Sequence, residues 1–237
     1  MTNEEFSNGM STLLNSYGQK AAVGDQNSFQ EIVLDEYEKS FFLTKAQEDL
    51  VQALYSGESI EGESFEHTER LRRYLSRLNK EASIEADAYS DILGIDTSSK
   101  VYTLPDDVWF ITYEAVKVNS DNCWNGKYVQ VIPTRQDEFH RKVKNPFRGA
   151  NNRRALRLDL DENRVEIVYP LGIDFYYVKY LRKPRPIILQ DLPENLSIND
   201  VSIETTCELN DVLHQKILER AVMLAVRSKT LLSTNRE

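Results

Sequence analysis

The chain has 237 residues, of which 41% are hydrophobic and 28% are charged, and its formal net charge of −9 gives a sequence pI near 5.0. This composition predicts a soluble globular protein with one large domain or two small ones. No apolar run approaches the roughly 20 residues of a membrane span, and the polar, acidic N-terminus lacks the pattern of a secretion signal. We therefore expect a protein that is neither membrane-bound nor exported by that route.

The first hundred residues are predicted to be helical. Residues 1–30 are rich in Ser, Asn, Gly and Gln, which favours a flexible arm with at most one short helix. Thr44 and Gln47 fit a capping box, in which each side chain bonds a free backbone N–H at a helix start, so a helix is expected over 45–56. A second helix is expected over 65–80, with an apolar face and a solvated polar face.

From about residue 99 the apolar residues follow the two-residue period of β-strands. A first pair of strands is β-branched and aromatic, and a polar connection with a glycine separates its members. A short helix capped from Thr134 follows, and then two alternating segments around an Asp-Glu-Asn turn predict a hairpin. The expected strands are residues 108–118, 127–132, 156–160, 165–169, 174–183 and 201–209.

The last segment, residues 207–229, predicts an amphipathic helix with more apolar surface than one face needs. On a helical wheel Leu209, Leu213, Ile217 and Leu224 form a stripe that suits the core of the chain. The next residues are apolar almost all round the axis, so they must be covered on more than one side. Either one large core holds the whole helix, or a second chain covers its other side. The candidates for such a contact between subunits are Leu218, Val222 and Ala225.

These elements predict the α+β fold class, with N-terminal helices, a central antiparallel β-rich module and a C-terminal amphipathic helix. Helices precede the strands along the chain, and a helix follows them. The expected division is a flexible N-terminal arm at 1–30, a helical module at 31–98, a β-rich module at 99–207, and a C-terminal helix and tail at 208–237.

The charge is unevenly distributed along the chain. Residues 1–100 carry 9 Lys or Arg against 19 Asp or Glu, whereas residues 101–237 carry 20 against 19. The segment 135–157 is markedly basic and can contact phosphate, pair with an acidic neighbouring subunit, or simply be solvated. The low overall pI argues against a dedicated nucleic-acid binder. The cations of this basic segment are Arg135, Arg141, Lys142, Lys144, Arg148, Arg153, Arg154 and Arg157.

Motifs for catalysis and metal binding are missing from the sequence. It contains no glycine-rich phosphate loop, no GxSxG and no HExxH. The histidines and cysteines lack partners at metal-ligand spacing, and a carboxylate cluster at the hairpin tip is explained by turn chemistry. Only the weak pair Cys123 and His140 supports an enzyme, so we expect no enzyme, no cofactor and no metal. The other residues weighed in this way are His67, His214, Cys207, Asp159, Asp161 and Glu162.

Two segments, residues 34–57 and 207–229, resemble virion proteins of tailed bacteriophages of Bacteroides-type hosts, especially the crAss-like phages. In those proteins a β-rich middle also ends in an acidic, helix-starting segment with a His one turn in, followed by an Ala-rich apolar helix. The similarity is to ring proteins of the head-to-tail connector beneath the portal, which are similar in role to the adaptor or gatekeeper rings of podoviruses. The two segments cover about 47 of the 237 residues.

This resemblance implies a virion structural protein of the tail or neck region, made in the cytoplasm of the bacterial host. It implies a homo-oligomeric ring, usually a homo-dodecamer, below the portal. The implied partners are further copies of the chain, the portal protein, other connector ring or tail proteins, and genomic DNA that passes through the lumen without sequence-specific binding. The alternative is a phage nucleic-acid-binding protein that uses the basic segment 135–157.

Overall fold

The computed structural model describes residues 1–21, 33–56, 73–89, 99–161 and 163–234, and the chain divides into two compact units. The helical unit consists of residues 1–78 and 184–237, and the β unit consists of residues 79–183. Helices at both ends of the chain and a central sheet confirm the α+β class. The helical unit contains both ends of the chain, whereas the division expected from the sequence placed the N-terminal and C-terminal helices in separate modules.

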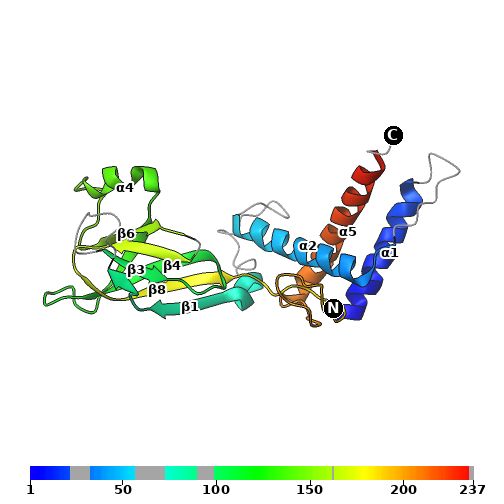
Figure 1. Cartoon of the computed structure of the whole chain (residues 1–237), viewed down its shortest axis with the longest axis horizontal. Helices are drawn as coiled ribbons and strands as arrows, with labels where there is room; N and C mark the ends of the chain where they lie inside the picture. Colours follow the sequence, from blue (N-terminus) through cyan, green and yellow to red (C-terminus); the bar gives the residue numbers. More distant parts are fainter. Residues whose placement is uncertain (22–32, 57–72, 90–98, 162, 235–237) are drawn as a thin grey trace. The chain divides into compact units, whose positions relative to one another are not determined.

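Three long α-helices in the described part of the helical unit pack on one another: α1 (Asn3–Ala21), α2 (Glu36–Ser56) and α5 (Asp211–Thr234). α5 contacts both α1 and α2 (Figure 1). Phe6, Met10 and Leu14 of α1 are at most 1% exposed, because their spacing of four residues places them on one face of the helix. The described part of the expected flexible arm is therefore a core helix.

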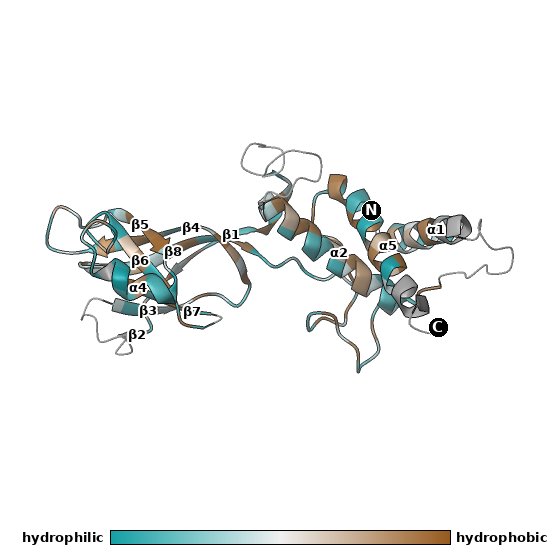
Figure 2. Ribbon diagram, turned by 90° about the horizontal axis from the view of Figure 1, so that it is seen from above, coloured by the Kyte–Doolittle hydropathy of each residue, from teal (hydrophilic) through white to brown (hydrophobic). Residues whose placement is uncertain are grey.

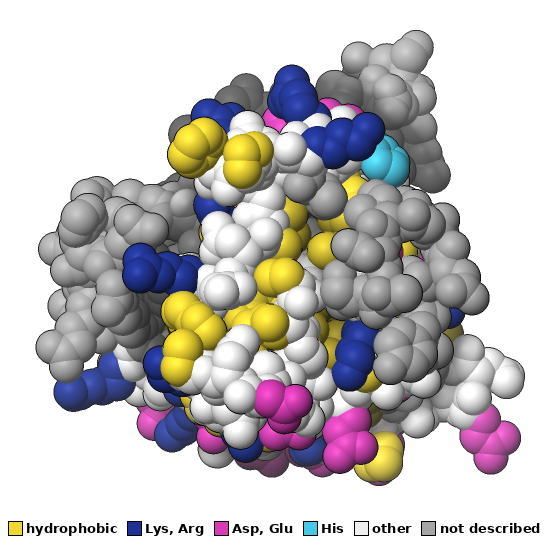
Figure 3. Space-filling model, turned by 90° about the vertical axis from the view of Figure 1, so that its left-hand side faces the viewer, with side chains coloured by type: hydrophobic (Ala, Val, Ile, Leu, Met, Phe, Trp, Pro, Cys, Tyr) yellow, Lys and Arg dark blue, Asp and Glu magenta, His cyan; other side chains and the backbone are white. Residues whose placement is uncertain are grey.

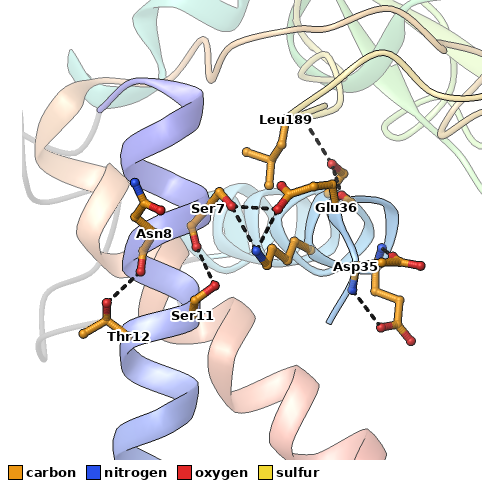
Figure 4. Close-up of polar contacts among 10 residues, drawn as sticks. Ser7, Asn8, Ser11, Thr12, Asp35, Glu36 and Leu189 are labelled. Atoms are coloured by element: carbon orange, nitrogen blue, oxygen red, sulfur yellow. Dashed lines mark hydrogen bonds and ion pairs between the residues drawn. The ribbon is translucent and has the colours of Figure 1, made fainter. Parts of the chain in front are cut away.

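α2 begins earlier in the chain than the expected helix at 45–56. Its capping box is formed by Asp35 and Glu38: Glu38 N donates to Asp35 Oδ1 over 2.6 Å, and Asp35 N donates to Glu38 Oε2 over 3.3 Å (Figure 4). Thr44, the expected cap, lies inside the helix and is 4% exposed. The predicted helix is confirmed, but its predicted cap is wrong.

Residues 184–210 return to the helical unit as an irregular segment. Isolated bridges join Ile188 to Thr205 and Ile198 to Val201, and the final strand expected at 201–209 is not formed. Hydrophilic and hydrophobic stretches alternate along α2 (Figure 2), and its polar side chains bond the backbone of this segment. Ser40, Thr44 and Gln47 bond the backbone of Leu189, Ile187 and Arg185, respectively.

The chain enters the β unit through a short helical turn. Residues 57–72 lie outside the described residues, so only the end of the helix expected at 65–80 can be compared. Residues 73–75 are helical, the 3-10 turn η2 (Ser76–Leu78) follows, and strand β1 begins at Asn79. The expected helix therefore extends two residues too far into the β unit.

Eight strands of the described chain form one sheet, in the order β1-β8-β4-β5-β6-β7-β3-β2. Its neighbours are antiparallel except β5 and β6, which are parallel. The helix α4 connects β5 to β6, as a crossover between parallel strands requires, so the module that was expected to be antiparallel contains one parallel pairing. The elements are β1 (Asn79–Ile84), β2 (Ala88–Tyr89), β3 (Ser99–Thr103), β4 (Val108–Asn119), β5 (Tyr128–Pro133), α4 (Gln136–Val143), β6 (Arg154–Asp159), β7 (Arg164–Val168) and β8 (Gly172–Arg182).

The sheet is curled, and its inner face holds the main core of the β unit. The Tyr102 ring on β3 lies 5.5 Å from the Tyr176 ring on β8, although these strands are far apart in the strand order. Lys100 Nζ also donates to Ile173 O over 3.1 Å, so the β3 and β8 sides of the sheet approach each other. Both expected strand pairs are confirmed as β4 with β5 and β6 with β7.

α4 covers part of the outer face of the sheet. Phe139 is 1% exposed and packs against Leu158 of β6 and Val168 of β7. The helix begins after Arg135, whose side chain forms no capping hydrogen bond, so the short helix is confirmed without the expected cap at Thr134. Among the described residues of the β unit α4 is the only α-helix, and Phe139 places it over β6 and β7.

Candidate subunit-contact surfaces

The three apolar residues of α5 that were candidates for a contact between subunits are buried inside the helical unit. Leu218 is 3% exposed, and Val222 and Ala225 are 0% exposed. α1 approaches α5 closely at Gly9, where an added Cβ would lie 2.9 Å from Leu218 Cδ2. Since the chain itself covers these side chains, they offer no surface to a second copy in this conformation.

The exposed apolar residues of α5 lie elsewhere on the helix. Val212 is 53% exposed and Met223 is 47% exposed, whereas Leu224, expected in the core, is half-buried. Met223 and Leu224 line a groove of about 520 Å³ between α2 and α5. Its remaining lining is mostly charged, so the groove is not an apolar seat for another helix. That lining comprises Asp49, Leu50, Lys216, Glu219, Arg220 and Arg227.

The basic segment lies on α4, the loop after it and the start of β6. Glu138 forms ion pairs with Lys142 over 2.9 Å and with Arg141 over 3.6 Å, and its hydrogen bond to Lys142 lowers the pKa of the Glu138 carboxyl. Figure 3 shows Lys and Arg side chains gathered at the top of one face, beside hydrophobic ones. The exposed cations of the segment are Arg135, Arg141, Lys144, Arg148 and Arg153.

Arg157 belongs to the interior of the β unit and not to this basic surface. Its Nη1 lies 3.0 and 2.9 Å from the two carboxylate oxygens of Glu114, and Tyr176 OH donates to Glu114 Oε2 over 2.6 Å. Burial raises the pKa of Glu114, and the Arg157 guanidinium opposes that rise. Arg157 thus neutralises a buried carboxylate and is not accessible to DNA or a protein partner, which corrects its inclusion among the contact candidates.

An exposed aromatic cluster that the sequence reasoning did not identify lies on the outer face of β4, β5 and β8. The rings of Tyr113 and Tyr177 lie 6.4 Å apart, and Tyr128 lies 6.2 Å from Tyr177 and 6.4 Å from Phe175. Ala115, which pairs with Tyr177 across the strands, lies at the centre and is fully buried. We call Tyr113, Tyr128, Phe175 and Tyr177 the aromatic surface. The sequence signal for this surface was that the segments 108–118 and 174–183 carry aromatic residues on both faces of the expected strands.

Two of the residues weighed for catalysis or metal binding have structural contacts in the described chain. Asp161 accepts backbone hydrogen bonds from Asn163 and Arg164, as a turn residue does, and His214 is buried in the helical unit. Cys123 and His140 are exposed, and His67 and Glu162 lie outside the described residues. The described residues contain no group of three or more His, Cys, Asp or Glu that could hold a metal. Nor does any helix in the described ranges have the length and apolarity to cross a membrane.

Comparisons with known proteins identify the family to which the chain belongs. The sequence model of the family described as phage tail ring protein 3/4 matches residues 1–237. Ring protein 3 of Bacteroides phage crAss001 is 48% identical over 240 residues, covering 100% of both chains. Ring protein 4/5 of the same phage is 31% identical over 234 residues, covering 95% of this chain and 92% of the relative.

The chain therefore belongs to the phage tail ring protein 3/4 family. The predicted resemblance to ring proteins of crAss-like phages is confirmed, and the chain is a ring-forming structural component of a virion. A ring built from copies of one chain needs two unlike surfaces on every copy, because its contacts are head-to-tail. The residues of α5 that were expected to form these surfaces are buried, so the exposed residues of the β unit are further candidates.

Proposed function

We propose that the chain forms a homo-oligomeric ring of the head-to-tail connector below the portal, where it serves as a conduit for DNA and a platform for further tail proteins. The observation that carries this proposal is the match to tail ring proteins along the whole chain. In this role the chain is structural and not catalytic. Its partners are further copies of itself, the portal protein and adjacent ring or tail proteins.

Ring formation is tested by measuring the mass of the purified chain alone and with portal protein. Native mass spectrometry and negative-stain electron microscopy are expected to show closed rings, because head-to-tail contacts close by rotation, and the resemblance to connector rings implies about a dozen copies. If the chain needs a template, rings appear only when portal protein is added. A chain that stays monomeric alone and fails to join portal rings would defeat the connector role.

Passage of DNA depends on the charge of the surface that faces the lumen. The net charge of −9 supports a lumen to which DNA does not adhere, because like charges repel. The exposed cations of the basic segment can instead contact phosphates as the genome passes. Changing Arg135, Lys144, Arg148 and Arg153 together to Glu tests this contact in assembled particles. Unchanged genome packaging and retention would exclude a lumen role for them.

A second candidate function is nucleic-acid binding by the basic segment on its own. The exposure of five cations at the start of α4, on α4 and in the following loop favours it, whereas the burial of Arg157 removes one phosphate contact from the expected set. DNA retention that weakens steeply as salt rises would support this function. No retention at low salt, measured with the intact chain in its assembled state, would remove it.

A further inference from the structure

Two loops of the described chain carry exposed apolar side chains among charges of a single sign. The basic loop, residues 144–153 of the β unit, contains Phe147, which is 86% exposed. The acidic loop, residues 190–206 of the helical unit, contains Ile203, which is 68% exposed, and Leu196, which is 38% exposed. The two loops therefore present the same kind of surface with opposite charge.

The cations of the basic loop lack acidic partners in the described chain. Residues 139–158 include seven Lys or Arg and no Asp or Glu. Within the loop Lys144, Arg148 and Arg153 are exposed, and none of them forms an ion pair with a described carboxylate. They differ in this from the cations of α4 that pair with Glu138. The positive charge around Phe147 is therefore not compensated by the described part of the chain.

The carboxylates of the acidic loop are unpaired in the same way. The sequence has six Asp or Glu and no Lys or Arg from residue 186 to residue 215. The helical unit has 13 Lys or Arg against 22 Asp or Glu, whereas the β unit has 16 against 16, so the whole net charge of −9 belongs to the helical unit. The exposed carboxylates of the acidic loop, none of which forms an ion pair with a described cation, are Asp191, Glu194, Asp200 and Glu204.

Hydrogen bonds hold the basic loop in a defined shape. Asn145 Oδ1 accepts from Phe147 N over 2.9 Å and from Arg148 N over 3.3 Å. Arg154 Nη2 donates to Phe147 O, and Gly149 N donates to Asn145 O over 2.7 Å. Both polar groups of the Phe147 backbone are therefore bonded, and its exposed ring extends from a fixed position. A side chain on a preorganised loop loses less entropy on docking.

The acidic loop is held in the same way within the helical unit. Figure 1 shows it in orange, beside the start of α1. Leu192 N donates to Ser202 O over 2.8 Å, and Glu204 N donates to Asp191 Oδ1 over 2.7 Å. These bonds lie on either side of Ile203, so its side chain also extends from a fixed backbone.

A second copy of the chain supplies the complement of each loop. Every copy in a ring has one basic loop and one acidic loop, so a head-to-tail contact between them uses both loops of every copy. Apolar side chains surrounded by charges of opposite sign on the two partners are the usual arrangement of a protein contact. A nucleic acid would fit the cations of the basic loop, but it would be repelled by the acidic loop and would leave Ile203 uncovered.

We propose that the basic loop of each copy docks on the acidic loop of the next copy around the ring, with Phe147 against Ile203 and the opposite charges of the loops paired around them. This contact assigns a subunit surface to the proposed ring and rests on that ring. One aromatic side chain buries about 150–250 Å², and a stable interface buries about 800 Å² per partner. The two loops are therefore the anchor of a larger interface, in which their charges select the surfaces that meet.

Complementary charge reversals in the full chain test the contact, with ring assembly followed by native mass spectrometry. The basic-reversed chain carries Lys144→Glu and Arg148→Glu, and the acidic-reversed chain carries Glu194→Lys and Glu204→Lys. Each alone is expected to need at least about tenfold more protein for assembly, because every interface loses its attraction. An equimolar mixture is expected to assemble at a lower concentration than either chain alone, since alternating copies restore the contact between unchanged loops. A mixture that assembles no better would overturn the proposal.

The matched control is the double variant Arg135→Glu with Arg141→Glu. It reverses two exposed cations of the same basic segment outside the basic loop, so it changes the net charge as much as the basic-reversed chain does. Its assembly is expected to stay within about threefold of the wild type, because surface charges away from a contact have little effect. Equal losses in the control and the basic-reversed chain would contradict the proposal.

Photo-cross-linking identifies what lies against Phe147 in rings of the full chain, assembled alone or with portal protein. Phe147 is replaced by the photoreactive aromatic p-benzoylphenylalanine, and the labelled chain is mixed with isotopically heavy wild-type chain before assembly. The expected product joins position 147 to the heavy peptide that contains Ile203. Cross-links to portal protein or DNA, within the labelled chain only, or to other peptides of the neighbour would overturn the contact, and so would no cross-link.

These results separate the contact between the loops from the ring itself. If wild-type rings form and position 147 cross-links elsewhere, the ring role stands and only this contact is wrong. If no preparation of the wild-type chain contains rings, the proposed function and the contact fail together. Thermal unfolding of each variant is measured in parallel. A basic-reversed chain that melts like the wild type but assembles poorly isolates the defect at the interface.

Discussion

The Thr44 hydroxyl of α2 forms two hydrogen bonds to the backbone of Ile187, a residue 143 positions further along the chain. Thr44 Oγ1 accepts from Ile187 N over 3.0 Å and donates to Ile187 O over 3.3 Å. Both partners are buried. A single side chain thus replaces the strand neighbour that an extended segment would otherwise need, which is how residues 184–189 are held against a helix without forming a sheet.

Thr44→Val is expected to destabilise the helical unit by about 1–3 kcal/mol, because it leaves the buried N–H and C=O of Ile187 without partners while keeping the side-chain shape. The change is measured by denaturant unfolding followed by far-UV circular dichroism. Thr44→Ser retains the hydroxyl and isolates its contribution. Thr12→Val, which removes an exposed hydroxyl on α1 (Figure 4), is expected to change stability by less than about 0.5 kcal/mol.

The sequence could predict the helix but not the role of Thr44, because the same four-residue pattern fits a cap and a buried polar stripe. Asp35 and Glu38 fit a capping box equally well, and they form the actual one. The segment 184–189 bonds the Thr44 hydroxyl inside the unit, and Asp35 and Glu38 form the cap. The same limit applies to Leu218: the helical wheel identified it as apolar, but Gly9 of α1 packs against it, and composition suggested that this part of the chain was a flexible arm.

Arg157→Met is expected to destabilise the β unit by about 3–5 kcal/mol, because it leaves the Glu114 carboxylate buried without its cationic partner. Combining Glu114→Gln with Arg157→Met removes the unpaired charge, so the double variant should lose less than the single one. The sequence contains two tryptophans, Trp109 and Trp124, and both belong to the β unit, so their fluorescence follows its unfolding.

The matched control for this pair is Arg153→Met, which alters an exposed cation of the same basic segment and should cost less than about 0.5 kcal/mol. Equal losses for Arg153→Met and Arg157→Met would contradict the buried ion pair. Counting charges along 135–157 could not separate these two arginines. Arg157 lies on β6 with Ala155 on the inner face of the curled sheet, and that orientation depends on the register of β6 with β5.

His214 predicts a pH dependence for the helical unit. It is 3% exposed and its Nε2 lies 3.2 Å from Leu209 O, and burial lowers the pKa of His214 below the ordinary value of 6.5. Below that value the unfolded chain binds a proton that the folded chain resists binding. The His214 contribution to stability is therefore present above about pH 6.5 and is lost as the pH falls towards the lowered pKa.

The measurement compares the free energy of unfolding at pH 7.5 and 5.5 for the wild type and for His214→Gln, whose amide can still donate to Leu209 O. The wild type is expected to lose more stability than the variant over this interval, because the glutamine does not titrate. Carboxylates remote from His214 affect both proteins alike and cancel in the difference. An equal loss in both would show that His214 does not set the slope.

Gly172 lies where β8 meets β4, and a side chain at this position would overlap the chain of its partner strand. Gly172 pairs with Asn119, and an added Cβ would collide with the Asn119 backbone oxygen. Gly172→Ala is therefore expected to destabilise the β unit by about 1–3 kcal/mol or more, since strands must move apart to admit a methyl group. Tryptophan fluorescence during urea unfolding measures the loss.

Gly126 provides the matched control, because it needs glycine for a different reason. Its φ of +71° lies in the left-handed region, but nothing lies within 4 Å of an added Cβ. Gly126→Asn should be tolerated, since asparagine adopts this conformation more readily than other residues, whereas Gly126→Ala should cost about 1–2 kcal/mol. Asparagine at Gly172 should be at least as damaging as alanine, because the obstacle there is backbone and not torsion. If asparagine restored stability at both glycines, the collision with Asn119 would not be the reason for Gly172.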